Sequence, residues 1–237
     1  MQRVLVTGAT SGIGRAIADT LHRAGFAVTA TGRNDTALAD LRAACPGLDT
    51  LRLDLSDRAA LAEALAGRSF DILINNAGIM PRPGTFDTMS DEDIDQTVEV
   101  NLSAVLSLTR LLLPQMRARK AGHLVFTGSS AAHAPGANFA VYAATKAAIS
   151  TFAAALRAEV SGDGIRVTEL VPGRVETALY AGVISTDARA AMYAGGGSLQ
   201  PSDIAEIILA VLRLAPHADV TRLDIMPTRP VPPISLK

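Results

Sequence analysis

The alternation of short apolar runs with longer segments of helical periodicity constrains this chain more than any other feature. Such alternation is typical of repeated βαβ units, whose parallel strands form one sheet with helices on both faces. We therefore predict an α/β fold, a doubly wound parallel sheet of seven strands. The expected strands are 3–7, 26–31, 50–53, 71–75, 123–128, 165–171 and 220–226, and the expected helices are 12–24, 35–44, 57–66, 91–119, 141–160 and 201–214.

Two local details accompany these elements. Helix 57–66 follows Ser56, a residue type that commonly caps helix N-termini, and helix 91–119 is expected to break near Asn101. Residues 178–200 follow neither period and are expected to form an insertion. We find no repeat and no linker, so we predict one domain over residues 1–237.

Charge and cysteine content exclude several classes of partner. The net charge of −1 gives no basic field for nucleic acid or for an acidic membrane. No stretch approaches the ~20 apolar residues of a membrane span, and the first residues do not resemble a signal peptide. Cys45 is the only cysteine, so we expect no disulfide framework and no metal site. A cytoplasmic location is the expectation.

A glycine-rich segment lies between the first expected strand and the first expected helix. Gly8 permits a tight turn, Gly12 lets backbone approach a pyrophosphate, and Gly14 allows close packing. The following helix N-terminus offers free N–H groups to phosphate. A plain βα turn could also use these glycines, but the order of strand, loop and helix favours a Rossmann-type dinucleotide site. The predicted phosphate-loop residues are Gly8, Thr10, Ser11, Gly12, Ile13 and Gly14.

The residues after the second expected strand indicate which dinucleotide binds. NAD-binding units usually place a carboxylate there, to bond the ribose 2′-hydroxyl. This chain has Gly32 followed by Arg33, and an arginine fork suits a 2′-phosphate. We predict NADP(H) in preference to NAD(H), the alternative being that Arg33 is a solvated surface residue.

Tyr142 and Lys146 are spaced i,i+4 on one expected helix and therefore share a face. A free tyrosine has a pKa of about 10, and a nearby ammonium lowers it. General acid–base groups work best when their pKa is near the working pH. Lys146 is thus predicted to tune Tyr142 as a proton donor and acceptor. Spacing alone would also fit an exposed Tyr–Lys stripe, but the glycine loop and an upstream serine favour catalysis.

Together with the glycine loop, four further stretches resemble the short-chain dehydrogenase/reductase family. They occur in the family's order, and the resemblance covers essentially the whole chain. The stretches are Asn75–Gly78, Val100–Leu102 around Asn101, Ser129 followed by Tyr142–Lys146, and Pro172–Thr177.

The resemblance implies hydride transfer between NADP(H) and a carbonyl or secondary alcohol. Ser129 would hold the substrate oxygen, Tyr142 would exchange its proton, and Lys146 would also bond the nicotinamide ribose. Asn101 would interrupt a helix and hold a water that extends the proton relay. Ser129 lies thirteen residues before Tyr142, which resembles the family spacing, although its neighbour Ser130 remains an alternative.

The resemblance also implies further cofactor contacts. Asp54 and Leu55 would contact adenine, although an exposed Asp near a helix cap fits equally, and Thr177 and Val175 would contact the nicotinamide. The remaining implied cofactor residues are Asn76, Ala77, Gly78, Tyr142, Lys146, Pro172 and Gly173.

The substrate region implied by the resemblance comprises residues 79–82, 130–139 and 174–197, so the insertion 178–200 is expected to bind substrate. Arg82 or Arg174 could hold an anionic group, although both could be solvated loop charges. Other expected lining residues are Met80, His133, Phe139, Tyr180, Met192 and Tyr193.

Two other functions are compatible with parts of this pattern. A catalytically idle, dinucleotide-sensing binding protein would share the fold, but it would be expected to have lost the Ser, Tyr or Lys. Longer epimerases and dehydratases also use a Tyr–Lys pair, with a larger C-terminal substrate region. Members of the family are commonly dimers or tetramers, so we expect a homodimer or homotetramer acting on a small molecule.

Overall fold

The computed structural model describes residues 1–181, 183–194 and 197–229. Across these ranges the strands form one parallel sheet of seven, in the order β3-β2-β1-β4-β5-β6-β7. The order runs outward in both directions from β1 and β4, so the predicted doubly wound α/β class is confirmed. The strands are β1 (Arg3–Val6), β2 (Ala27–Gly32), β3 (Asp49–Arg52), β4 (Ile72–Asn75), β5 (Gly122–Thr127), β6 (Ile165–Pro172) and β7 (Arg222–Ile225).

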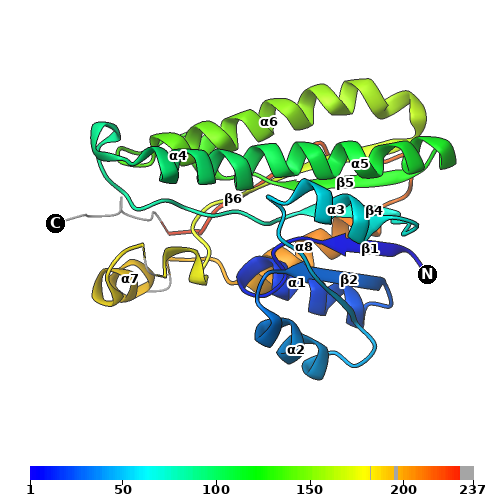
Figure 1. Ribbon diagram of the computed structural model, residues 1–237, viewed down its shortest axis with the longest axis horizontal. Coiled ribbons are helices and arrows are strands. Elements are labelled where there is room, and N and C mark those ends of the chain that lie inside the picture. Colours follow the sequence, from blue (N-terminus) through cyan, green and yellow to red (C-terminus); the bar gives the residue numbers. More distant parts are fainter. Residues whose placement is uncertain (182, 195–196, 230–237) are drawn as a thin grey trace.

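Helices cover both faces of this sheet. Figure 1 shows α4, α5 and α6 on one side of the strands and α1, α2 and α8 on the other. None of the helices in the described ranges is both long and apolar enough to span a bilayer. The helices are α1 (Gly12–Arg23), α2 (Asp35–Ala44), α3 (Arg58–Leu65), α4 (Asp91–Val98), α5 (Ala104–Arg119), α6 (Ala140–Val160), α7 (Thr186–Tyr193) and α8 (Pro201–Leu212).

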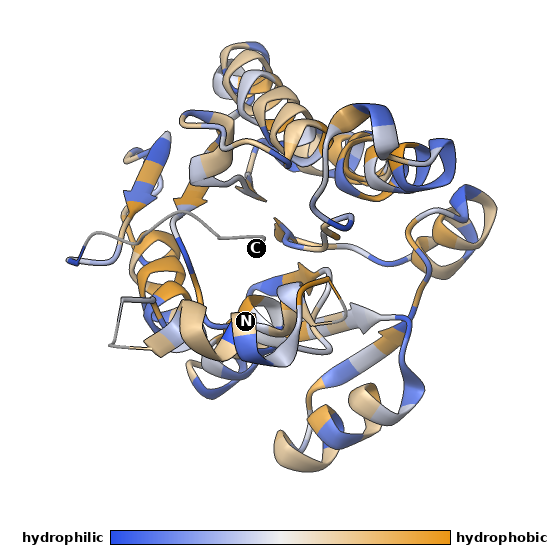
Figure 2. Cartoon of the chain, turned by 90° about the vertical axis from the view of Figure 1, so that its left-hand side faces the viewer, coloured by the Kyte–Doolittle hydropathy of each residue, from blue (hydrophilic) through white to orange (hydrophobic). Residues whose placement is uncertain are grey.

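Alternation along the strands supplies two hydrophobic cores, one on each face. Val4 and Val6 pack on the side of α1 and α8, whereas Leu5 between them packs on the side of α5 and α6. All three side chains are fully buried. Figure 2 colours the long uppermost helix, α6, mostly in hydrophobic tints, as its alanine-rich sequence requires. The sheet is therefore covered on both faces, and ligands can reach it only at its edges and strand ends.

The N-terminus of α3 corrects one local prediction. Asp57, not Ser56, is the N-cap, since its side chain accepts from the backbone N–H groups of Ala59 and Ala60. The Ser56 hydroxyl instead donates to Asp54 at 2.7 Å. Either residue type caps helices well, so which one does so depends on the competing partner.

The predicted insertion is partly helical. It contains a 3₁₀ turn, Ala178–Tyr180, and α7, which Figure 1 places away from the main helical layers. Positions 182, 195 and 196 of the predicted segment lie outside the described residues. The segment follows β6 and therefore begins at the carboxyl ends of the strands.

His123 of β5 is a buried titratable group in the sheet. Its Nε2 lies 2.8 Å from the Thr168 hydroxyl, and its side chain is 1% exposed. Burial, with a smaller contribution from Arg166, lowers the pKa of His123 to about 3. The folded protein therefore keeps this imidazole neutral at a pH where an ordinary histidine is protonated.

We predict that the free energy of unfolding falls as the pH drops below about 6.5. The reason is that His123 binds a proton in the unfolded chain, whereas it stays neutral in the folded protein. The slope due to this residue should approach roughly 1.4 kcal/mol per pH unit and persist toward pH 3. Urea unfolding between pH 7 and 5 checks this. His123→Gln should flatten the profile, while His217→Asn, at an exposed position, should not. Equal slopes for His123→Gln and the unmodified chain would contradict the assignment.

Candidate active site

A cavity of about 950 Å³ opens at the carboxyl ends of the strands. In a doubly wound sheet this edge, where the strand order reverses, is where ligands bind. The predicted residues that line it are Gly8, Thr10, Ser11, Gly12, Ile13, Arg33, Asp54, Leu55, Asn76, Ala77, Gly78, Ser129, Tyr142, Lys146, Pro172, Gly173, Val175 and Thr177. Gly14 and Asn101 are absent from this lining and lie behind the wall.

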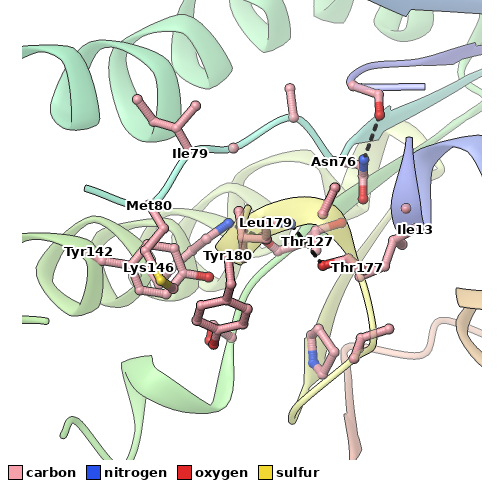
Figure 3. Close-up of a pocket in the computed structure, with 18 of the residues that line it drawn as sticks. Ile13, Asn76, Ile79, Met80, Thr127, Tyr142, Lys146, Thr177, Leu179 and Tyr180 are labelled. Carbon is pink, nitrogen blue, oxygen red and sulfur yellow. Dashed lines mark hydrogen bonds between the residues drawn. The ribbon is translucent and has the colours of Figure 1, made fainter. Parts of the chain in front are cut away.

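The glycine loop is held in place by the end of β4. The Thr7 hydroxyl accepts hydrogen bonds from the backbone N–H groups of Asn76 and Ala77, at 3.0 Å each. The Asn76 side chain donates to the Thr7 carbonyl at 3.0 Å. It also donates to the Gly8 carbonyl at 3.5 Å, the bond drawn beside Asn76 in Figure 3. The predicted Asn76–Gly78 turn thus fixes the loop that precedes α1.

The Arg33 end of the cavity is polar and more exposed. The Arg33 guanidinium lies 4.0 Å from Asp54, and both side chains are about half exposed, at 58% and 47%. Asp54 accepts hydrogen bonds from the hydroxyl and backbone N–H of Ser56, which lower the pKa of its carboxyl. Because Asp54 is held by Ser56 and only weakly by Arg33, the arginine can turn toward an anionic ligand.

Tyr142 reaches the cavity from the first turn of α6 and is 7% exposed. Burial raises the pKa of Tyr142 to about 12, although hydrogen bonding to Ser129 acts in the opposite direction. The prediction that Lys146 would lower this pKa is wrong, because burial dominates and Lys146 is not among the groups that shift it. The phenol is therefore protonated throughout the neutral range. This interaction with Ser129 favours that serine over Ser130 as the partner of Tyr142.

Lys146 lies one helical turn after Tyr142, as the spacing predicted. Its Nζ donates to the Thr127 carbonyl at 2.7 Å and lies 5.8 Å from the centre of the Tyr142 ring. Burial lowers the pKa of Lys146 to about 8. The amine can therefore exist in either protonation state near neutral pH. Figure 3 shows both side chains in the same part of the cavity, with Tyr180 beside them.

The predicted helix break at Asn101 is a π-helical turn, Glu99–Ser103, between α4 and α5. The Asn101 side chain accepts from the Ile79 N–H at 2.8 Å and donates to the Ile79 carbonyl at 2.9 Å. It also donates to the Thr145 hydroxyl at 3.3 Å. Asn101 therefore ties the segment after β4 to α6, next to Lys146.

The predicted substrate residues divide into two groups. Met80, Phe139, Arg174 and Tyr180 line the cavity, whereas Arg82, His133, Met192 and Tyr193 are absent from its lining. Loss of solvation lowers the pKa of Arg174, which is partly buried. The cavity wall therefore includes a partly buried cationic side chain at position 174.

Tyr193 of α7 acts from behind this wall. Its hydroxyl accepts from the Thr177 backbone N–H at 3.3 Å and lies 3.3 Å from the carbonyls of Val175 and Thr177, so it can donate to one of them. These contacts hold the backbone of the segment that follows β6 and position it along the cavity.

The sequence prediction missed part of the wall. Met226, Pro227 and Arg229, which follow β7, line the cavity because the Gly173 N–H donates to the Ile225 carbonyl at 2.7 Å. This hydrogen bond joins residues far apart in the sequence, so no local sequence pattern predicts it. Within the described residues, no cluster of three His, Cys, Asp or Glu side chains could bind a metal.

A parallel sheet with a glycine loop and a cavity at its strand ends defines a Rossmann-type protein. The family model "short chain dehydrogenase" matches residues 2–188. The short-chain type dehydrogenase/reductase y4eK of Sinorhizobium fredii is 44% identical over 94% of this chain and 90% of its own length. The NADP-dependent 3-hydroxy acid dehydrogenase YdfG of Escherichia coli K12 is 35% identical over 94% of each chain.

A solved structure gives the same result. Serine dehydrogenase in its closed form, complexed with NADP⁺, superposes with a TM-score of 0.93 and 33% identity, covering 99% of each chain. The chain belongs to the short-chain dehydrogenase/reductase family, and it is an oxidoreductase of that family.

Proposed function

We propose that this protein transfers hydride between NADP(H) and a carbonyl or secondary alcohol, with Ser129, Tyr142, Lys146 and Asn101 as its catalytic set. One observation carries the proposal: Tyr142, Lys146 and Ser129 converge in the same cavity as the glycine loop. A catalytically idle sensor would have no need for this buried Tyr–Lys pair.

The residues near Arg33 fit NADP(H). Arg33 lines the cavity at the end of β2, where a 2′-phosphate would be read. A side chain at position 32 would be crowded, because a Cβ built on Gly32 lies 2.3 Å from the Thr10 methyl. An NAD-type carboxylate therefore has little room there unless Thr10 moves. The names of YdfG and of the solved serine dehydrogenase complex, both with NADP, support the same choice.

The bound cofactor would supply the hydride, and the protein would supply the proton and the geometry. Ser129 and Tyr142 line the same cavity and interact with each other, and together they would hold a carbonyl oxygen. Tyr142, protonated because its pKa is raised to about 12, donates its proton as charge develops on that oxygen. Lys146, with its pKa near 8, can resupply that proton. Asn101 holds the Ile79 segment against α6, beside this relay.

Small hydroxy acids and their carbonyl counterparts are the proposed substrates to test first. The relatives named above act, by their names, on a 3-hydroxy acid and on serine. Arg174 in the cavity wall would suit a carboxylate, since a guanidinium bonds two carboxylate oxygens at once. Apolar neighbours such as Met80 and Phe139 would pack on the remainder of the substrate.

The experiment that tests this function follows the loss of NADPH absorbance with a panel of carbonyl compounds. The panel contains β-keto acids, β-ketoesters, acyl thioesters, keto sugars and simple ketones, with 3-hydroxy acids and NADP⁺ in the reverse direction. Turnover with at least one class is expected. Tight NADPH binding with no turnover across the panel would instead favour the sensor.

Arg33→Asp should shift cofactor preference toward NADH. The substitution removes a charge-assisted contact worth about 1.5–3 kcal/mol and adds repulsion, so NADPH should lose roughly 10–100-fold in kcat/KM relative to NADH. Steady-state kinetics with both cofactors measure the ratio. Arg213→Asp, a matched charge change at the exposed C-cap of α8, is the control. An unchanged ratio in Arg33→Asp would show that Arg33 does not bind the phosphate.

A further inference from the structure

A buried carboxylate lies next to the proposed catalytic residues without belonging to them. Glu169 is in the middle of β6 and is 4% exposed. Its Oε2 accepts a hydrogen bond from the Ser150 hydroxyl at 2.9 Å. Its Oε1 is buried and has no hydrogen-bond partner among the described residues. Burying a carboxylate is costly unless a positive charge compensates it.

Helix α6 places that carboxylate close to the proton relay. Tyr142, Lys146 and Ser150 are spaced by four residues and therefore share one face of the helix. The Ser150 bond fixes Glu169 at this face, one turn beyond Lys146. The Glu169 carboxylate therefore lies at the same face of α6 as Tyr142, the proposed proton donor.

Glu169 also contacts the backbone that supports the site. A Cβ built on Gly128 would lie 2.6 Å from Glu169 Oε1, so the carboxylate lies tightly against this residue. Gly128 is between Thr127, whose carbonyl accepts from Lys146, and Ser129. A larger residue at position 128 would displace the carboxylate or the strand end.

Three positively charged or titratable groups face Glu169. The His133 ring, at the end of the turn Ser130–Ala132, has its Nε2 3.8 Å from Oε1, and its side chain is 31% exposed. Arg222 of β7 interacts with Glu169 from an exposed position and pairs with Asp224. Lys146 is buried, and the negative charge of Glu169 opposes the lowering of its pKa. Of these groups, Lys146 is the buried one, which solvent screens least.

We propose that Glu169 is a positioning residue for Lys146: its buried carboxylate keeps the lysine charged as an ammonium and thereby sets the alkaline limit of turnover. The proposal rests on the function proposed above for Lys146. It assigns a role to a residue that touches neither substrate nor cofactor in the described cavity lining.

Glu169→Gln tests the role of the charge. The amide keeps the shape and can still accept from Ser150, but it carries no charge. The alkaline limb of kcat should move to lower pH by about one unit, within the range for loss of a neighbouring opposite charge. From a pKa of about 8, this lowers the charged fraction at pH 8 about five-fold. Glu169→Asp should restore the limb, and Ser150→Ala, which keeps the charge, should leave it in place.

A second measurement needs no turnover. Between pH 8 and 10.5, Lys146 is protonated in the unfolded chain but largely neutral in the folded protein. The melting temperature should therefore rise with pH in that range. In Glu169→Gln the rise should begin below pH 8. In a Lys146→Met background, Glu169→Gln should leave the pH dependence of the melting temperature unchanged.

The outcomes separate the two proposals. If the unmodified enzyme fails to turn over any substrate, the proposed function is wrong, and the unfolding profiles still test Glu169. If kcat falls equally at every pH in Glu169→Gln and Glu169→Asp, the residue only supports packing and the proposal is overturned. Coinciding unfolding profiles for Glu169→Gln and the unmodified chain would overturn it as well.

Discussion

Tyr142→Phe should lower kcat for NADPH-dependent reduction by roughly 10²–10⁴-fold, the contribution typical of a general acid. Phenylalanine keeps the ring that fills the 7% exposed site on α6 and removes only the hydroxyl. The fold and the cofactor contacts should therefore survive. Single-turnover kinetics, with NADPH binding measured by fluorescence titration, separate the chemical step from binding.

Tyr180→Phe is the matched control for this variant. Tyr180 lines the same cavity and interacts electrostatically with Tyr142, but it is not one turn from Lys146. Its loss of kcat should be far smaller. If Tyr142→Phe retained turnover while Tyr180→Phe lost it, the proton donor would have been assigned to the wrong phenol.

The pairing of Tyr142 with Lys146 could be predicted from the sequence, but the direction of the pKa shift could not. Spacing in a helix follows from covalent geometry, so i,i+4 side chains lie on the same face. Burial depends on what other segments place over that face. Here the covering segments leave Tyr142 nearly without solvent, and this loss of solvation raises its pKa.

The parallel sheet and the position of the site residues at one of its edges could be predicted for a related reason. Parallel strands joined by helices end at one edge, so the loops after β1, β4, β5 and β6 meet there. Glu169 was not predicted, because the sequence does not show which polar residue of a mostly apolar strand is buried. Its partner Ser150 is nineteen residues away and on another element.

The finer boundaries depended on competition between neighbouring groups. Ser56 and Asp57 are both residue types that cap helices well. Asp57 is the cap because the Ser56 hydroxyl donates its hydrogen bond to Asp54. The family resemblance implied a break at Asn101, and the alternative reading was a local irregularity, because asparagine is a poor helix former. Its form as a π-helical turn was not predicted, and there the Asn101 side chain pairs with the Ile79 backbone.

Gly14→Ala should abolish tight NADPH binding, because the first turn of α1 packs against the loop at this residue. A Cβ on Gly14 would lie 2.3 Å from the Gly8 carbonyl oxygen and 2.5 Å from the Asn76 side-chain nitrogen. Neither neighbour can yield easily, since Gly8 is backbone and Asn76 is bonded to Thr7. The loop must therefore move away from the helix N-terminus. Losing one or two backbone contacts to phosphate, worth about 1.5–3 kcal/mol each, weakens NADPH binding roughly 100-fold or more.

The same overpacking should cost stability, by about 1–3 kcal/mol, or a melting temperature lower by roughly 2–10 °C. Gly162→Ala is the matched control, because a Cβ there meets nothing within 4 Å. Fluorescence titration with NADPH and thermal unfolding compare the two variants. Equal NADPH affinity in both would mean that the phosphates do not rest on this loop. Without that contact, the cavity would have no site for the cofactor on which Tyr142, Lys146 and Ser129 are proposed to act.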